Sequence, residues 1–596
     1  MNMRTHNSLD INIKLQDQTV SLCGWVQARR DHGGVIFFDL RDHNEIVQIT
    51  CHPEDTKPFE IAQTVRNEYV LQVTGVVKPR GEGLTNKKLL TGEIEVIASE
   101  IAILNTSAPL PLMLEDHKNT AEETKLKYRY LDIRRTEMTQ RLKLRSKLNQ
   151  LIRNYLQEHD FTEVETPCLT SATPEGARDY LVPSRNQLGK FYALPQSPQI
   201  FKQLLMVAGM ERYYQIVRCF RDEDLRADRQ PEFTQLDVEM SFINEEDIQQ
   251  LMENMVRGIF KTLINVDLPN PFPQMTYEDA MHNYGNDRPD LRNPLKLIEL
   301  SDVLTNVDFK VFSDPANNPE GRVAAICIPN GNTISRKQID NYTKYVTKYG
   351  AKGLAYIKVN DVTQGLAGLQ SPIVKFLTAD IASSIIERCQ ANSGDIIFFG
   401  ADTTTVVNQA LGALRDKLGE DLSLLQSLWQ PLWVIDFPMF EADDDNSWQA
   451  LHHPFTAPQN QDPEALLSNP GNSLSRAYDM VINGSEVGGG SIRIHKQDMQ
   501  QAVFKLLNIS EQEAQDKFSH LLNALQYGCP PHGGIAFGLD RLAMILSDCK
   551  SIRDVIAFPK TQNGLCPLTN APSTIAKSTL EEIGVCVADT KITQED

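Results

Sequence analysis

The sequence of 596 residues contains no long apolar run and no clustered cysteines. No stretch approaches the roughly 18 consecutive apolar residues of a membrane-spanning helix, and the opening residues, MNMRTHNSLDINIKLQDQ, lack the apolar core of a signal peptide. The ten cysteines include no CxxC pair, which argues against a zinc knuckle or a disulfide framework and favours reduced thiols. We therefore expect a globular protein that stays in the cytoplasm and has no membrane partner.

Positive charge is scarce too, since the net charge is -19. A surplus of acidic groups argues against binding of nucleic acids, whose phosphates need Lys and Arg. Between residues 125 and 153, however, ten basic residues stand against two acidic ones. Such a run is more often a solvated helix face than a nucleic-acid contact, so it permits RNA binding without indicating it.

A chain of this length exceeds what one hydrophobic core accommodates, and its pattern changes along the sequence. Residues 1–108 hold five short β-type runs separated by turns, which suits a small barrel of the kind that binds single-stranded nucleic acid. The proline-bearing stretch 109–120 predicts a hinge. Residues 121–289 and 425–596 bracket a segment, 290–424, with strand and helix patterns of its own, which indicates a folded insertion. The expected fold class is α+β with several domains.

The segment Phe220–Met240, FRDEDLRADRQPEFTQLDVEM, predicts two strands joined by a polar loop. Its second half alternates in polarity, so one face of the strand is polar and the other mostly apolar. The first face carries Phe233, Gln235, Asp237 and Glu239, and the second carries Thr234, Leu236, Val238 and Met240. Arg221, at the end of the first strand, has the planar fork that suits a phosphate or a carboxylate. Charge alternation alone usually marks a solvated sheet face, but the length of this pattern favours a site.

This segment resembles motif 2 of the class II aminoacyl-tRNA synthetases, in the form of the aspartate, asparagine and lysine subgroup. Residues 533–546, GGIAFGLDRLAMIL, resemble motif 3, and residues 161–167, FTEVETP, after a basic amphipathic helix, resemble the dimer-forming motif 1. With TPEGARDYLVPS and LPQSPQIFKQLLM between motifs 1 and 2, the resemblance extends over nearly the whole chain. It is to the bacterial type of aspartyl-tRNA synthetase, whose extra domain matches the insertion.

The resemblance implies an OB-fold anticodon-binding domain at 1–108, a hinge at 109–120 and an inserted α+β domain at 290–424. Residues 121–289 and 425–596 would form a catalytic domain on an antiparallel sheet, with an extension at the C-terminus. The implied activity is that of a homodimeric ligase, which uses ATP and Mg²⁺ to attach L-aspartate to tRNA through an aspartyl-adenylate and does not bind DNA.

By the same resemblance, Arg221 contacts the α-phosphate and the reacting carboxylate, Glu223 the adenine side, and Arg541 the γ-phosphate, and these three are the expected catalytic residues. Phe233 stacks on adenine. The remaining expected ATP-binding residues are Asp222, Gln230, Glu486, Gly538, Leu539 and Asp540. The chemistry is phosphoryl transfer, in which the protein positions the reactants and neutralises charge and needs no covalent nucleophile.

Asp479 and Glu486 lie seven residues apart around the turn NGSEVGGGS and are the expected Mg²⁺ ligands, because hard carboxylate oxygens bridge Mg²⁺ to phosphates. Isolated loop carboxylates more commonly cap a turn. The adjoining glycines 488–490 favour close approach of a ligand to the backbone.

The amino-acid pocket must neutralise a second carboxylate, and Lys202 and Arg493 supply the charge. With asparagine they would face a neutral amide at a cost of several kcal/mol, so aspartate is expected to be preferred by about a thousandfold or more. Lysine is excluded by charge repulsion. The other expected aspartate-binding residues are Glu175, Ser197, Gln199, Arg221, Gln235, Asp237 and His452. A pair such as His452 and His453 is more often structural, and only the resemblance favours His452 as a substrate contact.

In the barrel, Phe37, Gln48 and Glu95 match the residues that read anticodon bases in bacterial aspartyl enzymes. Without the resemblance, Phe37 would be assigned to the strand core and the other two to solvent-facing positions. His32 and Gly83 match the relaxed form of these enzymes, which charges tRNA(Asn) as well as tRNA(Asp), although both are also ordinary turn residues.

Three alternatives remain open from the sequence. The first is an enzyme restricted to tRNA(Asp). The second is a non-catalytic RNA-binding paralogue, which would be expected to have lost a phosphate-binding arginine or a metal carboxylate. The third is an asparagine-forming ligase on the same catalytic fold, which would not need the amino-terminal barrel.

Overall fold

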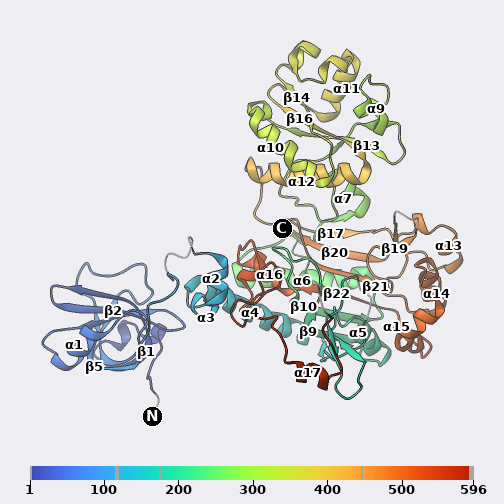
Figure 1. The fold of residues 1–596 in the computed structure, drawn as a ribbon. Coiled ribbons are helices and arrows are strands. Elements are labelled where there is room, and N and C mark those ends of the chain that lie inside the picture. Colours follow the sequence, from blue (N-terminus) through green and yellow to red (C-terminus); the bar gives the residue numbers. More distant parts are fainter. Residues whose placement is uncertain (1–2, 115–119, 173–175, 444–446, 589–596) are drawn as a thin grey trace. The chain divides into compact units, whose positions relative to one another are not determined.

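The computed structural model describes residues 3–114, 120–172, 176–443 and 447–588 (Figure 1). The chain forms two compact units, residues 1–139 and residues 140–596. None of the helices in the described residues combines the length and the hydropathy that a membrane crossing needs.

The first unit is built on a closed five-stranded barrel with the strand order β1-β2-β3-β5-β4. Its elements are β1 (Thr19–His32), β2 (Val35–Arg41), β3 (Ile46–Cys51), α1 (Thr56–Thr64), β4 (Val70–Pro79) and β5 (Ile94–Asn105). Along β2, Ile36, Phe38 and Leu40 enter the core, because successive side chains of a strand point to opposite faces. The five predicted strands and the OB-type barrel are thus confirmed.

Two short helices, α2 (Glu122–Lys127) and α3 (Arg129–Asp132), follow the barrel in the first unit. Glu68 of the barrel is buried and accepts hydrogen bonds from Arg41 at 3.0 Å and from Arg134 at 2.7 Å. The Arg134 guanidinium also lies over the Trp25 ring, 5.5 Å from its centroid. Arg134 therefore fastens the chain after α3 to the barrel.

Much of the basic run at 125–153 is used in ion pairs within the protein. Arg129 and Arg135 both pair with the fully buried Asp132, at 2.9 and 2.7 Å. Farther along, Arg145 pairs with Asp540 and Arg153 with Glu163. The basic run was predicted to be either a solvated helix face or an RNA contact. The structure instead shows that many of its side chains are paired with carboxylates of the protein itself.

The second unit contains an eight-stranded sheet with the order β11-β17-β20-β21-β22-β10-β9-β6. Its strands are β6 (Thr162–Glu163), β9 (Arg212–Phe220), β10 (Glu232–Ser241), β11 (Gln274–Thr276), β17 (Pro431–Ile435), β20 (Ala477–Ile482), β21 (Ser485–Ile492) and β22 (His532–Gly538). The pairs β11–β17 and β6–β9 are parallel and the others antiparallel. This is the predicted antiparallel catalytic sheet, and it joins strands from both sides of the insertion.

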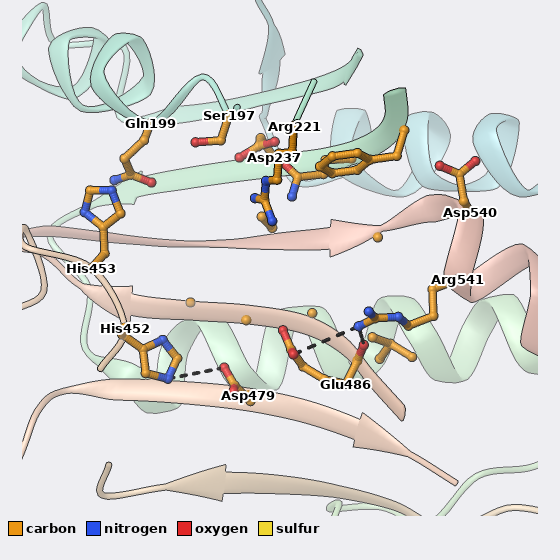
Figure 2. Close-up of a pocket in the computed structure, with 18 of the residues that line it drawn as sticks. Ser197, Gln199, Arg221, Asp237, His452, His453, Asp479, Glu486, Asp540 and Arg541 are labelled. Atoms are coloured by element: carbon orange, nitrogen blue, oxygen red, sulfur yellow. Dashed lines mark hydrogen bonds and ion pairs between the residues drawn. The ribbon is translucent and has the colours of Figure 1, made fainter. Parts of the chain in front are cut away.

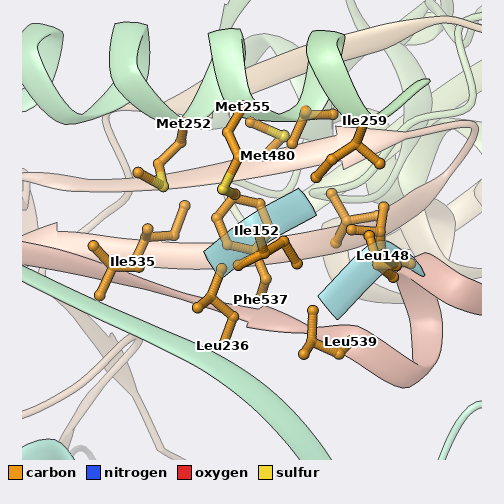
Figure 3. Packing of buried hydrophobic residues seen from close by; sticks show 14 of the residues in the cluster. Leu148, Ile152, Leu236, Met252, Met255, Ile259, Met480, Ile535, Phe537 and Leu539 are labelled. Carbon is orange, nitrogen blue, oxygen red and sulfur yellow. The ribbon is translucent and has the colours of Figure 1, made fainter. Parts of the chain in front are cut away.

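Three helices pack on one face of this sheet: α4 (Thr136–Glu158), α6 (Glu245–Ile264) and α16 (Leu539–Leu546). Figure 3 shows this core, in which Leu148 and Ile152 of α4 and Met255 of α6 lie close to the strands. The residues that β10 contributes to it are Leu236, Val238 and Met240. Because the side-chain period of a strand is two, Asp237 and Glu239 are left on the opposite face of the sheet.

Besides α7 (Tyr277–Tyr284), which precedes the insertion, the described residues of the second unit outside the insertion form two hairpins and five further α-helices. The hairpins pair β7 (Leu181–Pro183) with β8 (Phe191–Ala193) and β18 (Phe440–Ala442) with β19 (Trp448–Ala450). The helices are α5 (Gln199–Val207), α13 (Pro463–Ser468), α14 (Gln497–Leu506), α15 (Glu511–Leu525) and α17 (Lys577–Glu582). Among these, α5 lies against β9 and β10 and so brings its polar residues to the sheet.

The insertion follows α7 (Tyr277–Tyr284) and forms a five-stranded antiparallel sheet with the order β12-β13-β16-β14-β15. The strands are β12 (Ile298–Glu299), β13 (Gly321–Ile328), β14 (Ala355–Val359), β15 (Leu369–Gln370) and β16 (Ile396–Thr403), and the helices are α8 (Ser301–Leu304), α9 (Lys310–Ala316), α10 (Arg336–Val346), α11 (Ala379–Cys389) and α12 (Thr404–Asp421). Ile326 and Phe398 enter one apolar cluster, whereas Ala325 and Phe399 enter another. Both faces of this sheet are therefore covered, and the predicted α+β character is confirmed.

Candidate active site

A cavity of about 420 Å³ lies on the face of the large sheet that carries Asp237 (Figure 2). Most residues that the sequence analysis assigned to ATP, aspartate or Mg²⁺ line this cavity, although they come from both sides of the insertion. They are Ser197, Gln199, Lys202, Arg221, Glu223, Gln230, Phe233, Gln235, Asp237, His452, Asp479, Glu486, Arg493, Gly538, Asp540 and Arg541. The tertiary structure thus brings three distant segments to one place.

Three of the expected residues are not among those that line the cavity. The N–H of Asp222 donates to the carbonyl of Arg178 at 3.0 Å. The side chain of Leu539 lies in the hydrophobic core, so only its backbone could face a ligand. Glu175 lies outside the described residues.

Two cations and two carboxylates form a buried cluster, of which Lys202, Asp237 and Arg493 line the cavity. Lys202 Nζ donates to Asp237 Oδ1 at 2.9 Å and lies 3.5 Å from Glu239 Oε2. Arg493 donates to both oxygens of Glu239, from Nε at 2.9 Å and from Nη2 at 3.2 Å. All four side chains are at least nine-tenths buried, so the geometry satisfies the requirement that buried charges be paired.

This pairing corrects the expectation that Lys202 and Arg493 stand ready for a ligand carboxylate by themselves. Both already face protein carboxylates, and a bound carboxylate would have to share them. Burial raises the pKa of Asp237, against the opposing effect of Lys202. Burial would also raise the pKa of Glu239, but Arg493 and Lys202 outweigh it and hold that pKa below its ordinary value. Oδ2 of Asp237 is buried and has no hydrogen-bond partner within the described part of the chain, so it can accept from a ligand ammonium.

Glu239 is the functional residue that the sequence analysis left without a role. Its place in the polar alternation of β10 is the signal that could have assigned one. Glu239 pairs with Gly534 of β22 across the sheet, and a Cβ at Gly534 would lie only 1.9 Å from Glu239 Oε2. The glycine therefore makes room for the carboxylate that holds Arg493.

Two arginines, Arg221 and Arg541, also line the cavity. Arg221 follows β9, and its guanidinium lies over the Phe233 ring at 5.0 Å from the centroid. The Nε of Arg221 is buried and has no hydrogen-bond partner among the described residues. Arg541, in the first turn of α16, donates to the Glu486 carbonyl and lies 3.4 Å from Asp228. Arg221 is therefore the arginine with unused donor capacity toward the cavity.

Asp540 and Gln230 line the cavity but also hold the protein together. Asp540 Oδ2 accepts from the Thr234 N–H at 2.7 Å, and Oδ1 accepts from Arg145. Gln230 exchanges two hydrogen bonds with the backbone of Lys560, at 2.7 and 3.2 Å. Because these groups are engaged in structural bonds, we expect them to shape the nucleotide site more than to bind the nucleotide.

Asp479 and Glu486 meet over the glycine-rich strand β21, and Figure 2 shows both carboxylates in the cavity. A Cβ at Gly489 would lie 2.8 Å from Asp479 Oδ1 and 3.2 Å from Glu486 Oε1. Burial, then Glu486, then Asp287 raise the pKa of Asp479 well above its usual range. Oδ1 of Asp479 also has no hydrogen-bond partner among the described residues. Two hard carboxylates on either side of one glycine, one of which raises the pKa of the other, fit a divalent cation such as Mg²⁺.

His452 and His453 are both neutral at pH 7, since burial lowers their pKa values to about 4 and about 3. His452 Nε2 lies 3.7 Å from Asp479 Oδ1. His453 Nδ1 accepts from the Phe455 N–H at 3.3 Å, which assigns the ring proton to Nε2. His453, which the sequence analysis left structural, also lines the cavity.

The three expected anticodon residues share the outer face of the barrel. Phe37, Gln48 and Glu95 lie on β2, β3 and β5 and are each half-buried, whereas Phe38 is fully buried. Gln48 Nε2 donates to Glu95 at 3.1 Å. Phe37 is thus an outward residue and not strand core. His32 and Gly83 are exposed, and Gly83 has φ +80° with open space where a side chain would stand.

Comparison with known proteins gives matches along nearly the whole chain. Residues 121–562 match the family described as tRNA synthetases class II (D, K and N), and residues 20–104 match the OB-fold nucleic acid binding domain. The chain is 57% identical over 593 residues to proteins named aspartate–tRNA(Asp/Asn) ligase from two strains of Legionella pneumophila, Corby and Philadelphia 1, covering 99% of this chain and 100% of each relative.

Two solved structures share the fold. One is the asparaginyl-tRNA synthetase of Pyrococcus horikoshii in complex with asparaginyl-adenylate, with a TM-score of 0.58 and 18% identity over 93% of this chain and 98% of that one. The other is the asparaginyl-tRNA synthetase of Entamoeba histolytica with the same ligand, with a TM-score of 0.57 and 19% identity over 92% and 96% of the two chains. At such identities the likeness concerns the fold alone.

Proposed function

The chain belongs to the class II tRNA synthetases of the D, K and N group, and we propose that it uses ATP to attach L-aspartate to tRNA through an aspartyl-adenylate. The observation that carries this proposal is one cavity lined both by Arg221 and by Lys202, Asp237 and Arg493 of the buried charged cluster. The full-length relatives named aspartate–tRNA(Asp/Asn) ligase support the same activity.

Activation is an attack of an aspartate carboxylate oxygen on the α-phosphorus of ATP, with pyrophosphate leaving in line. Phe233 offers a face for adenine, and the Arg221 guanidinium above it reaches the α-phosphate, with an Nε that has no hydrogen-bond partner among the described residues. Arg541 binds the far end of the triphosphate. These side chains act by orientation and by charge neutralisation, which supply most of the catalysis in phosphoryl transfer.

Asp479 and Glu486 would hold Mg²⁺, which supplies positive charge to the triphosphate when it is bound. The described residues contain no group of three His, Cys, Asp or Glu side chains placed to hold a metal. ATP is an anion, yet Asp479 and Glu486 make this part of the cavity acidic. A role of the two carboxylates in holding the cation accounts for their presence.

The buried cluster selects the amino acid. Asp237 Oδ2 accepts from the ammonium of aspartate, together with Ser197, Gln199 and Gln235, while Arg493 and Lys202 bind its side-chain carboxylate. Asparagine would present an amide N–H₂ to these cations, and the unpaired donors would cost several kcal/mol. Glu239 and Asp237 also pair with Lys202 and Arg493. The preference for aspartate over asparagine therefore depends on the positions of these two cations as much as on their charge.

The enzyme charges both tRNA(Asp) and tRNA(Asn), is a homodimer and acts in the cytoplasm. The outer face of the barrel, with Phe37, Gln48 and Glu95, would read the anticodon by stacking and hydrogen bonding. A dimer interface is supported by large apolar side chains that are exposed in this chain, namely Leu169, Leu181, Phe191 and Phe242. Static light scattering tests the dimer, and the mass of a monomer would contradict it.

The test of the function is aspartate-dependent exchange of pyrophosphate into ATP, followed by charging of purified tRNA(Asp) and tRNA(Asn). We expect exchange with aspartate and not with asparagine, and charging of both tRNAs. The double change His32→Leu and Gly83→Lys should lower charging of tRNA(Asn) much more than charging of tRNA(Asp). Gly83→Asn is the control for the backbone, because asparagine tolerates φ +80°. Absent exchange would reject the enzyme, and charging of tRNA(Asp) alone would support the restricted alternative.

A further inference from the structure

The inserted domain carries a hollow of about 430 Å³ lined by residues from α10 to Lys348 and from α12. Figure 1 shows where α10 and α12 lie in this domain. Six of its lining residues form what we call the lysine–tyrosine face: Gln338, Asn341, Lys344, Tyr345, Lys348 and Lys417. None of them lines the active-site cavity. Every one carries a hydrogen-bond donor.

The helical period explains how this face arises. Ile339, Tyr342 and Val346 of α10 are buried against the sheet of the insertion. Asn341 and Lys344, which lie between these positions, therefore point outward. Lys348 is also exposed and lies in the 3-10 helix Thr347–Tyr349 that follows α10 directly. Burial of the apolar stripe thus leaves the donors in one row.

Lys344 and Lys348 stand four residues apart and are exposed. Neither forms an ion pair or a side-chain hydrogen bond within the part of the chain that the structure describes. Lys344 lies in the last turn of α10 and Lys348 in the 3-10 helix after it, and like charges on neighbouring turns repel each other. Their arrangement therefore gives the isolated protein no stability and suits an external anion.

Positive charge is concentrated in the stretch of the insertion that contains α10. The insertion at 290–424 has 14 basic and 15 acidic residues, whereas the stretch 336–352 has five basic residues against Asp340 alone. The acidic groups on the facing helix are partly neutralised, since Asp421 pairs with Lys417 at 2.5 Å and Asp416 with Arg415 at 3.0 Å. Glu420 of α12 is the remaining carboxylate near Tyr345.

Tyrosines accompany the lysines. The rings of Tyr345 and Tyr349 lie 5.4 Å apart, and their hydroxyls are 3.2 Å from each other. Lysine, tyrosine, asparagine and glutamine are the side chains that commonly contact the sugar–phosphate backbone of nucleic acids. A short acidic peptide would need apolar contacts in addition to charge, and the residues that line this hollow are mostly polar.

We propose that the lysine–tyrosine face binds the phosphate backbone of the tRNA that the enzyme charges, and adds affinity without reading bases. This inference rests on the proposed function, which requires an RNA partner for a protein of net charge -19. A protein so acidic must meet RNA on local basic surfaces. Much of the other basic run, at 125–153, is already used in internal ion pairs.

The test is the double variant Lys344→Glu/Lys348→Glu. The matched control is Lys310→Glu/Lys375→Glu, which makes the same change of net charge at exposed positions of the same domain. Binding of both tRNAs is measured by fluorescence over a range of KCl concentrations, and pyrophosphate exchange is measured without tRNA. The conservative variant Lys344→Arg/Lys348→Arg keeps both positive charges and should retain wild-type affinity.

We expect Lys344→Glu/Lys348→Glu to weaken binding of both tRNAs equally, by about tenfold or more, and to lower the slope of log K against log salt by roughly two, one for each lost phosphate contact. Exchange should stay at the wild-type rate. An affinity and a salt slope equal to those of the control variant would overturn the inference. Failure of the proposed function is distinguishable, because the wild-type enzyme would then show no aspartate-dependent exchange.

Discussion

The substitution Arg221→Ala separates catalysis from stability more cleanly than any other change in the cavity. The guanidinium contacts the protein through its position over Phe233, and its Nε has no partner among the described residues. Removing it loses a cation–π contact worth about 0.5–2 kcal/mol but also removes a buried donor without a partner. We therefore expect the free energy of unfolding to change by about 1 kcal/mol or less.

The loss of activity should be much larger, because no neighbouring cation can replace Arg221. Arg541 is engaged by the Glu486 carbonyl and Asp228, and Arg229 pairs with Glu223 at 3.0 Å. Loss of one preorganised donor to a developing charge typically costs about a hundredfold to a thousandfold. We expect adenylate formation to fall by at least about a hundredfold, which corresponds to about 2.7 kcal/mol of barrier.

The assay is aspartate-dependent pyrophosphate exchange, with denaturant unfolding as the measure of stability. Arg218→Ala is the matched control, since Arg218 belongs to β9, which Arg221 follows, and its side chain is 44% exposed. It should keep near-normal exchange. Wild-type-like exchange by Arg221→Ala would refute the assigned role. A collapse of stability in that variant would refute the argument that the group is free for a ligand.

Three further changes test the carboxylates and histidines of the cavity. Asp479→Asn removes the repulsion from Glu486, so it should leave stability unchanged or raised while increasing the Mg²⁺ concentration needed for half-maximal exchange by about tenfold or more, as a Mg²⁺ titration would detect. Glu239→Gln leaves a buried cation short of its partner and should lower the free energy of unfolding by about 3–5 kcal/mol in a denaturant titration; an unchanged midpoint would contradict the pairing. The pKa values of His452 and His453 are lowered to about 4 and about 3, so the unfolded chain binds protons first as the pH falls below about 6.5. Stability should therefore fall between pH 6.5 and 4, by up to about 1.4 kcal/mol per pH unit for each histidine, and a double His→Gln variant should show a flatter profile.

Local pattern was enough to predict the elements that carry the site. The alternation of β10 places Leu236 and Val238 in the core and Asp237 on the opposite face, because a strand has a side-chain period of two whatever it packs against. The barrel strands were predicted from five short β-type runs separated by turns. Arg541 follows a glycine-rich strand directly and is placed by the short turn into α16.

Only the tertiary structure decided which charges meet. Arg493 and Glu239 are 254 residues apart in the sequence, and Lys202 and Asp237 come from a helix and a strand. Their pairing depends on the register of β10 with β22, which sets Gly534 opposite Glu239 and leaves space for its carboxylate. The same packing engages Asp540 with Arg145 and Thr234. A residue's own neighbours fix the face on which it lies, but its partner across the site is fixed by packing between distant segments, on which sequence spacing carries no information.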